Sequence, residues 1–259
     1  MTSTTTTPRS ATGAVALSGV TKVYGRGANA VLALDGVSLD VEPGEFVCLV
    51  GASGCGKSTL LNLIAGLDRP SGGQIGLGDG VDPGLMFQEP ALFPWLTVEG
   101  NVEVPLKLRG LPRAERRERV AELLHTVHLA DFSRRRPHEL SGGMRQRVAL
   151  ARTLALDTPL LLMDEPFGAL DAMTRDILHD ELERIWSERR LTVLFVTHNV
   201  REAARLADRI ILLSSRPGRI IWSTRVDVPR PRRIDSPEIA SIAAEVTDRL
   251  RSEVGRHGR

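Results

Sequence analysis

The sequence predicts an α/β fold built around a mostly parallel β-sheet. Three apolar runs of strand length support this prediction, and each is followed by glycine or polar residues: residues 46–50, 160–165 and 192–197. Residues 59–67 and 145–156 carry apolar side chains at helical spacing and would cover such a sheet. Because the carboxyl ends of parallel strands meet at one edge, the polar residues after these runs are expected to lie together.

The first run leads into a glycine-rich loop, Gly-Ala-Ser-Gly-Cys-Gly-Lys-Ser-Thr. Glycines let successive backbone N–H groups point at one anion, the following helix adds its positive dipole end, and Lys57 adds a charge. The spacing predicts a nucleoside triphosphate site, with the Ser58 hydroxyl on Mg²⁺. Because Cys55 lies among these amides, we expect its thiol to be reactive. The residues expected to bind the nucleotide are Gly51, Ala52, Ser53, Gly54, Cys55, Gly56, Lys57, Ser58 and Thr59.

The other two runs end in chemically active residues. Asp164 and Glu165 close the second run, and His198 follows the third. Asp164 is expected to hold Mg²⁺ through water, as the acidic partner does in P-loop ATPases. Glu165 is well placed to polarise an attacking water molecule. His198 could reach the same edge of the sheet, although any one of these groups alone is more often a plain surface residue.

A second anion-binding element precedes the helical stretch that begins at Arg145. Ser141, Gly142 and Gly143 combine a hydroxyl, two unhindered backbone amides and a helix N-terminus. The chain has one lysine-bearing glycine loop. The second element is therefore expected to serve the same nucleotide or another copy of it.

These motifs together resemble the ATP-binding-cassette (ABC) ATPases over about residues 14 to 220. The resemblance implies the α/β P-loop NTPase fold of an ABC ATPase core, which adds an antiparallel β-subdomain and an inserted helical subdomain to the parallel sheet. It implies ATP and Mg²⁺ as cofactors and a homodimer, in which each ATP is held by one phosphate loop and covered by the other copy's Ser-Gly-Gly segment.

The resemblance also implies roles for single residues. Glu165, His198 and Gln88 would be catalytic, and Ser58, Gln88 and Asp164 would serve the metal. The remaining nucleotide contacts would be Tyr24, which stacks on adenine, Ser141, Gly142, Gly143 and Gln146 of the signature segment, and Asp171 of the D-loop.

Three sequence segments resemble, more specifically, those of the nitrate/sulfonate/taurine importer ATPases: residues 89–98, 166–171 and 215–220. Such subunits drive uptake of a small solute through separate permease subunits, which receive it from a periplasmic or lipid-anchored binding protein. An ATPase of a lipoprotein-release or other export system is the alternative. A non-transport ABC ATPase is a further one, although this chain lacks a long coiled-coil insertion and tandem cassettes. The segment Phe93–Val98, with Trp95 and Leu96, would face the permease.

Composition agrees with a peripheral subunit at the cytoplasmic face of the cell's inner membrane. No apolar run approaches 18 residues. The two cysteines, Cys48 and Cys55, lack metal-site spacing. A net charge of +2 argues against general nucleic-acid binding.

The chain is expected to divide into a disordered leader (1–12), an ABC ATPase domain (13–228) with a helical subdomain at about 95–157, and a C-terminal linker and helix (229–259). The glycine-rich stretch 72–85 is expected to trim the antiparallel sheet. The arginines between 113 and 119 and at 134–136 are expected to face water.

Overall fold

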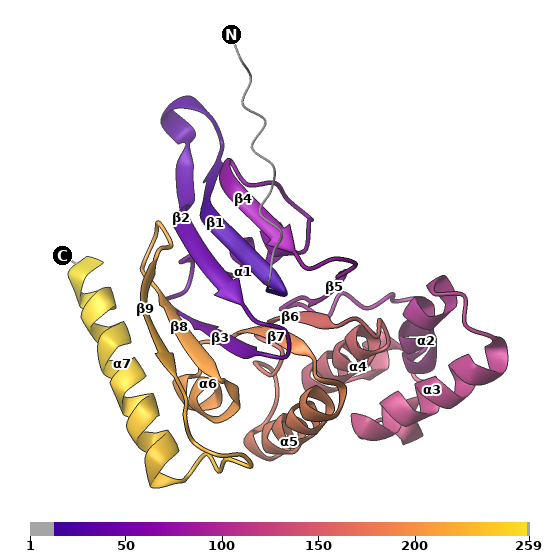
Figure 1. Cartoon of the computed structure of the whole chain (residues 1–259). Helices are drawn as coiled ribbons and strands as arrows, with labels where there is room; N and C mark the ends of the chain where they lie inside the picture. Colours follow the sequence, from indigo (N-terminus) through magenta and orange to yellow (C-terminus); the bar gives the residue numbers. More distant parts are fainter. Residues whose placement is uncertain (1–12, 258–259) are drawn as a thin grey trace.

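The computed structural model describes residues 13–257, and the expected leader at residues 1–12 lies outside them. Two sheets and a set of helices make up this part of the chain (Figure 1). The strands are β1 (Val15–Tyr24), β2 (Val31–Val41), β3 (Phe46–Val50), β4 (Gly72–Leu77), β5 (Pro83–Met86), β6 (Leu160–Asp164), β7 (Thr192–Val196), β8 (Arg209–Leu213) and β9 (Ile220–Arg225).

The helices alternate with the strands through much of the chain. The α-helices are α1 (Lys57–Ile64), α2 (Val98–Leu108), α3 (Arg113–Thr126), α4 (Gly142–Leu154), α5 (Ala172–Arg189), α6 (Val200–Leu206) and α7 (Pro237–His257). The 3-10 helices are η1 (Gly27–Asn29), η2 (Ala130–Phe132) and η3 (Pro137–Glu139).

The larger sheet confirms the predicted α/β class. Its order is β5-β6-β7-β3-β8-β9, and all neighbours are parallel except β8 and β9. Every residue of β3, β6 and β7 is buried. Because both faces are covered, these strands are apolar along their whole length, as their sequences predict.

The two faces of the larger sheet contribute to separate hydrophobic clusters, because successive side chains along a strand alternate in direction. Val47 and Leu49 of β3 join a cluster with α1 and with the smaller sheet. Phe46 and Cys48 of the same strand join the other cluster, which includes α4, α5, α6 and α7. The central strands are therefore held from both sides, and their carboxyl ends remain at one edge.

The smaller sheet is antiparallel, with the order β2-β1-β4. The stretch 72–85 supplies one strand to each sheet, β4 to the smaller and β5 to the larger. Gly73 has φ +78°, and a Cβ there would lie 2.3 Å from the Gly19 carbonyl oxygen. Glycine in this stretch thus permits a close approach of two backbones.

Helices α2, α3 and α4, with the 3-10 turns between them, form the inserted part of the chain. Of these helices, α2 and α3 project from one side of the molecule (Figure 1). The apolar stripe of α3 is buried and consists of Val120, Leu123 and Leu124. The arginines at 113, 117 and 134–136 are exposed as expected. Arg116 and Arg119 are only partly exposed, and they pair with Glu103 at 2.8 Å and Glu122 at 2.7 Å.

The C-terminal helix α7, Pro237–His257, lies within the stretch expected to hold a linker and a helix (229–259). Ile239, Ala243 and Val246 are buried against the rest of the chain. No helix within residues 13–257 is both long enough and apolar enough to cross a membrane.

Candidate nucleotide-binding site

The glycine loop joins the end of β3 to the start of α1, as the sequence predicts. Gly54 and Gly56 have φ values of +75° and +103°, which residues with a Cβ rarely adopt. A Cβ on Gly56 would also lie 2.7 Å from Leu34 Cδ2 and 3.0 Å from the Ala33 carbonyl oxygen. Both conformation and space therefore require glycine at the point where the loop enters the helix.

Lys57 is buried within this loop. Its ammonium donates to the carbonyl oxygens of Gly51 and Ala52 at 2.8 and 2.9 Å, and its Nζ lies 3.7 Å from the Cys55 sulfur. Cys55 is 1% exposed. The expectation that this thiol is readily reactive is therefore wrong for the folded loop, because reagents cannot reach the sulfur.

Asp164 stands at the end of β6, beside Ser58 of the loop. The Ser58 hydroxyl is hydrogen-bonded to its carboxylate. Burial raises the pKa of Asp164 above its usual value, the Ser58 hydrogen bond and Lys57 lower it, and the nearby charge of Glu165 raises it further. The structure thus brings together two oxygen ligands that the sequence assigned to Mg²⁺.

Glu165 follows in a left-handed conformation, with φ +46°. This conformation is unfavourable for a residue with a side chain. Its N–H donates to the Val196 carbonyl oxygen at 2.9 Å. Its carbonyl oxygen accepts from Gln146 Nε2 at 3.1 Å and from the Gly168 N–H at 3.2 Å. One hydrogen bond within the turn, one to β7 and one from α4 therefore hold this backbone.

Gln146 is 3% exposed and lies behind Glu165. Besides donating to the Glu165 carbonyl, its side-chain oxygen accepts from the Ala169 N–H at 3.0 Å. Gln146 therefore links α4 to both ends of the turn after β6. Sequence reasoning placed it among nucleotide ligands, and the structure adds a role in positioning Glu165.

His198 lies directly opposite Glu165, with 3.0 Å between its Nδ1 and Glu165 Oε2. Beneath it, the Thr197 hydroxyl is bonded to the carboxylate of the buried Glu202 and accepts from the Asn199 N–H at 2.9 Å. Asn199 in turn caps α6. The imidazole is exposed, but the backbone that carries it is fixed.

A cleft of about 440 Å³ brings together seven of the predicted nucleotide ligands with Gln88 and Glu165. The lining comprises Tyr24, Val31, Ala33, Ser53, Gly54, Gly56, Lys57, Ser58, Thr59, Gln88, Glu165 and Arg216. Tyr24 stands at its mouth, 41% exposed. Its hydroxyl donates to Asp68 at 3.2 Å, and Lys22 Nζ lies 4.8 Å from its ring centroid. Arg216 was not predicted as a site residue, although it lies in the segment 215–220 that resembles the importer ATPases.

The Ser-Gly-Gly segment of the same chain does not line this cleft. Gly142 lines a separate hollow of about 360 Å³, which also includes Gln88, Glu165 and His198. Ser141 caps α4 by accepting from the Met144 N–H at 3.2 Å. Asp171 caps α5 by accepting from the Thr174 N–H at 3.0 Å, and this hydrogen bond lowers its pKa. The two predicted phosphate-binding elements therefore lie apart within one chain.

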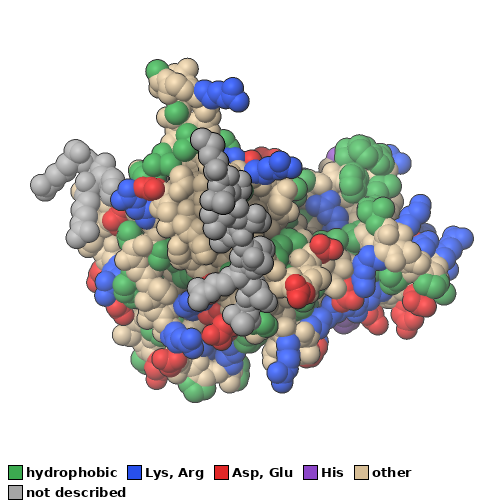
Figure 2. Space-filling view, turned by 45° about the horizontal axis from the view of Figure 1, so that its top comes forward, with side chains coloured by type: hydrophobic (Ala, Val, Ile, Leu, Met, Phe, Trp, Pro, Cys, Tyr) green, Lys and Arg blue, Asp and Glu red, His purple; other side chains and the backbone are tan. Residues whose placement is uncertain are grey.

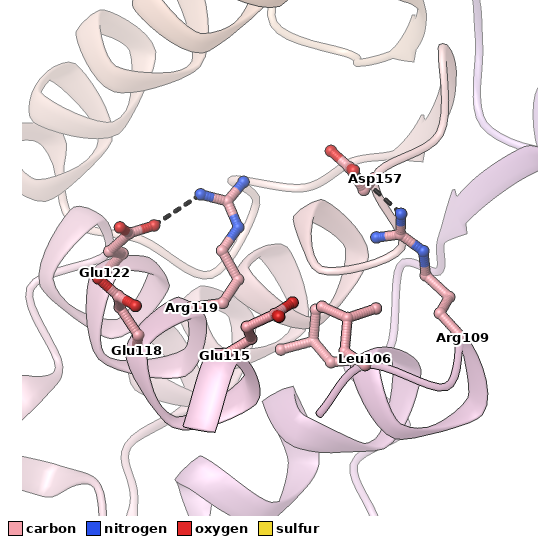
Figure 3. Close-up of a pocket in the computed structure, with 8 residues that line it drawn as sticks. Leu106, Arg109, Glu115, Glu118, Arg119, Glu122 and Asp157 are labelled. Carbon is pink, nitrogen blue, oxygen red and sulfur yellow. Dashed lines mark hydrogen bonds and ion pairs between the residues drawn. The ribbon is translucent and has the colours of Figure 1, made fainter. Parts of the chain in front are cut away.

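A further groove of about 360 Å³ lies on the inserted helices (Figure 3). Glu115, Glu118 and Glu122 of α3 lie around it, and Asp157 pairs with Arg109 at its edge at 3.1 Å. Carboxylates dominate this groove and it lacks a glycine loop, so its chemistry does not suit a triphosphate.

Comparisons with known proteins agree with this site. Residues 34–168 match the family model described as ABC transporter. The chain is 46% identical over 241 residues to an uncharacterized ABC transporter ATP-binding protein of Methanocaldococcus jannaschii, covering 91% of this chain and 90% of that protein.

Two relatives with named substrates are equally similar. A nitrate import ATP-binding protein of Synechocystis sp. is 50% identical, and the match covers 77% of each protein. An aliphatic sulfonates import ATP-binding protein of Bacillus licheniformis is 46% identical, covering 87% of this chain and 89% of the relative.

Solved structures give the same result. A dimeric bacterial ABC transporter cassette matches with a TM-score of 0.76 and 36% identity, covering 83% of this chain and all of that one. The same cassette, in a post-hydrolysis state bound to ADP and Pi, matches equally well. With its phosphate loop, acidic strand end and signature segment on the P-loop NTPase fold, the chain belongs to the ABC transporter family and is an ATP-binding ATPase subunit.

Proposed function

We propose that this chain powers an importer for a small anion, such as nitrate or a sulfonate, and that it works as a homodimer with ATP between the copies. The observation that carries the dimer is the separation of Lys57 from the Ser141–Gly143 segment within one chain, on two different hollows. One triphosphate can meet both elements if a second chain supplies the second. The dimeric form of the related cassette supports this arrangement.

The metal site that we propose consists of Ser58, Asp164 and Gln88. The first two are already hydrogen-bonded, and Gln88 lines the same cleft as Ser58. No group of three or more His, Cys, Asp or Glu side chains suited to a metal occurs within residues 13–257. Such a sparse set fits Mg²⁺, which usually keeps waters and phosphate oxygens as its other ligands. When bound, Mg²⁺ would neutralise charge on those phosphate oxygens.

Hydrolysis is proposed to depend on the Glu165 carboxylate. It would accept a proton from the attacking water while the backbone bonds to Val196, Gln146 and Gly168 keep its position. His198, 3.0 Å from that carboxylate, would help to hold the terminal phosphate. Tyr24 at the mouth of the cleft would stack on the adenine, with Lys22 near the tyrosine ring.

The permease is proposed to contact the segment Phe93–Val98, which begins the inserted helical part. Trp95 is 68% exposed, and its ring lies 5.6 Å from that of Phe93. Figure 2 shows hydrophobic side chains gathered over this side of the molecule. Contact with permease subunits would place the chain at the cytoplasmic face of the membrane, with a solute-binding protein delivering the anion on the other side.

Import is preferred to export because the relatives with named substrates are import proteins for nitrate and sulfonates. The direct test is uptake. Cells that lack this gene should lose uptake of the transported anion, assayed with radiolabelled nitrate, taurine and an alkanesulfonate, and the wild-type gene should restore it. Normal uptake of all three in the deletion strain would overturn the proposed substrate class.

The Trp95→Ala variant tests the permease contact. It should restore uptake poorly although the purified subunit keeps its ATPase rate, because Trp95 lies outside the nucleotide cleft. Leu108→Ala is the matched control, since Leu108 is 84% exposed at the end of α2. Full uptake with Trp95→Ala would exclude this residue from the contact.

A further inference from the structure

Arg216 is the one charged residue of the nucleotide cleft to which the function above gives no role. It lies in the loop between β8 and β9, and its Nε and one Nη each donate to the Gly54 carbonyl oxygen at 3.3 Å. The sequence separation between the two residues is 162 positions. A guanidinium from the far end of the chain is thus placed against the phosphate loop.

The loop that carries Arg216 is closely fitted to the back of the phosphate loop. The Gly218 N–H donates to the Ala33 carbonyl oxygen at 2.8 Å, and the Gly218 carbonyl oxygen accepts from the Asp35 N–H at 3.0 Å. A Cβ on Gly218 would lie 2.2 Å from the Cys55 carbonyl oxygen. This approach is possible only for glycine, and it fixes the distance between Arg216 and the phosphate loop.

Internal bonds and the C-terminal helix hold the same loop. The Ser214 hydroxyl donates to the Pro217 carbonyl oxygen at 2.7 Å and accepts from the Arg219 N–H at 2.8 Å. The Ser215 N–H donates to Glu253 Oε1 of α7 at 3.2 Å. Arg216 is therefore an exposed side chain on a fixed backbone, an arrangement that pre-organises it for a ligand.

We propose that Arg216 binds the phosphate chain of the nucleotide, an inference that rests on ATP binding in the cleft described above. Its bonds to Gly54 use two of the five N–H donors of a guanidinium. The remaining donors suit phosphate oxygens, which arginine binds in a forked, charge-assisted geometry. Phosphate is favoured over the base because Arg216 touches the loop whose backbone amides converge on phosphate, whereas Tyr24 serves the base.

The test compares the affinities of ATP, ADP and adenosine, measured by displacement of a fluorescent ATP analogue. Arg216→Ala should weaken ATP and ADP by about tenfold and leave adenosine unchanged, because adenosine has no phosphate. The ATP and ADP affinities of Arg216→Lys should lie between those of Arg216→Ala and the wild type, since lysine keeps the positive charge but not the forked guanidinium geometry. Tyr24→Ala provides the contrast, because loss of stacking should weaken ATP and adenosine alike by about tenfold.

Arg225→Ala is the matched control for loss of charge. Arg225 is exposed on β9. In the strand register it lies opposite Arg209, at the end of β8 that is away from the phosphate loop. If Arg216→Ala binds ATP as tightly as Arg225→Ala, or if it loses adenosine and ATP affinity equally, Arg216 does not bind phosphate. Failure of the wild-type protein to bind ATP would instead overturn the whole site.

Discussion

Glu165 combines the reactive carboxylate with a backbone conformation that costs about 1–3 kcal/mol in a residue other than glycine. Its N–H and carbonyl make three hydrogen bonds, to Val196, Gln146 and Gly168. The buried amide of Gln146 is central because it bonds to both Glu165 and Ala169. The strain is thus offset by contacts that also aim the carboxylate at the cleft.

Asp164 should lower the stability of the nucleotide-free protein at neutral pH. Burial raises the pKa of its carboxyl group. Below the unfolded-state pKa the group is protonated in both states and costs nothing. As pH rises through the window between the unfolded and the raised folded pKa, stability falls, because the unfolded state releases the proton more readily.

Asp164→Asn should therefore raise the melting temperature by a few degrees at pH 7, and the gain should disappear in acid, below the usual aspartate pKa. The same variant should lose ATPase activity with its metal ligand. Calorimetry at several pH values measures the difference, with the exposed Asp79→Asn as control. An unchanged or lowered melting temperature of Asp164→Asn at pH 7 would show that the charged Asp164 carboxylate does not destabilise the folded protein.

At the scale of elements, the phosphate loop is held from behind as well as by its own glycines. The β8–β9 loop contacts it through Gly218 and Arg216, and the Leu34 side chain of β2 fills the space beside Gly56. The Cys55 side chain points into this packing and is almost completely covered. The phosphate loop is therefore tightly packed on the face opposite to the one proposed to bind the nucleotide.

The rate at which a thiol reagent labels Cys55 measures how often the phosphate loop opens. In the folded protein, maleimide should modify both cysteines slowly, since Cys48 is 0% and Cys55 1% exposed, and burial also raises the pKa of Cys48. Denaturant should make two thiols reactive. A Cys48→Ala variant isolates Cys55 for mass spectrometry. Rapid, complete labelling of the folded variant would mean that the loop opens often.

At the scale of the whole molecule, Lys57 and Gly142 line two different hollows of one chain, and Glu165 and Gln88 line both. The binding site of a nucleotide held by Lys57 could therefore be completed by Ser141–Gly143 of a second copy. In the arrangement proposed above, ATP would favour the dimer, and its hydrolysis would remove the shared anion and let the dimer open.

Glu165→Gln tests this arrangement. Glutamine keeps the shape of the side chain but cannot accept the proton, so hydrolysis should fall by about 10²–10⁴ while ATP still binds. The variant should then accumulate as a dimer with Mg·ATP, measured by light scattering, whereas the wild type with ADP should remain monomeric. Glu165→Gln combined with Lys57→Ala should stay monomeric, because the phosphate loop has lost its charge.

Two outcomes would contradict the prediction separately. A wild-type hydrolysis rate in Glu165→Gln would remove this carboxylate from catalysis. An inactive variant that stays monomeric with ATP would leave the catalytic role intact and exclude the shared site.

The sequence by itself determined the α/β class, the phosphate loop, Asp164, Glu165 and the Ser141–Gly143 segment. These are local patterns, in which a buried apolar strand or a helix start directly precedes or follows the reactive residue, so neighbouring positions suffice to identify them. The C-terminal helix was predictable for the same reason.

The tertiary structure decided what depends on contacts between distant residues. Arg216 reaches Gly54 across 162 positions, and no spacing in the chain reports that contact. The burial of Cys55, the strained turn at Glu165 and the bridging amide of Gln146 likewise arise from packing of separate elements. Local sequence specifies which groups are available, but the packed sheet edge determines which of them meet, because side chains from separate strands, helices and loops converge there only after folding.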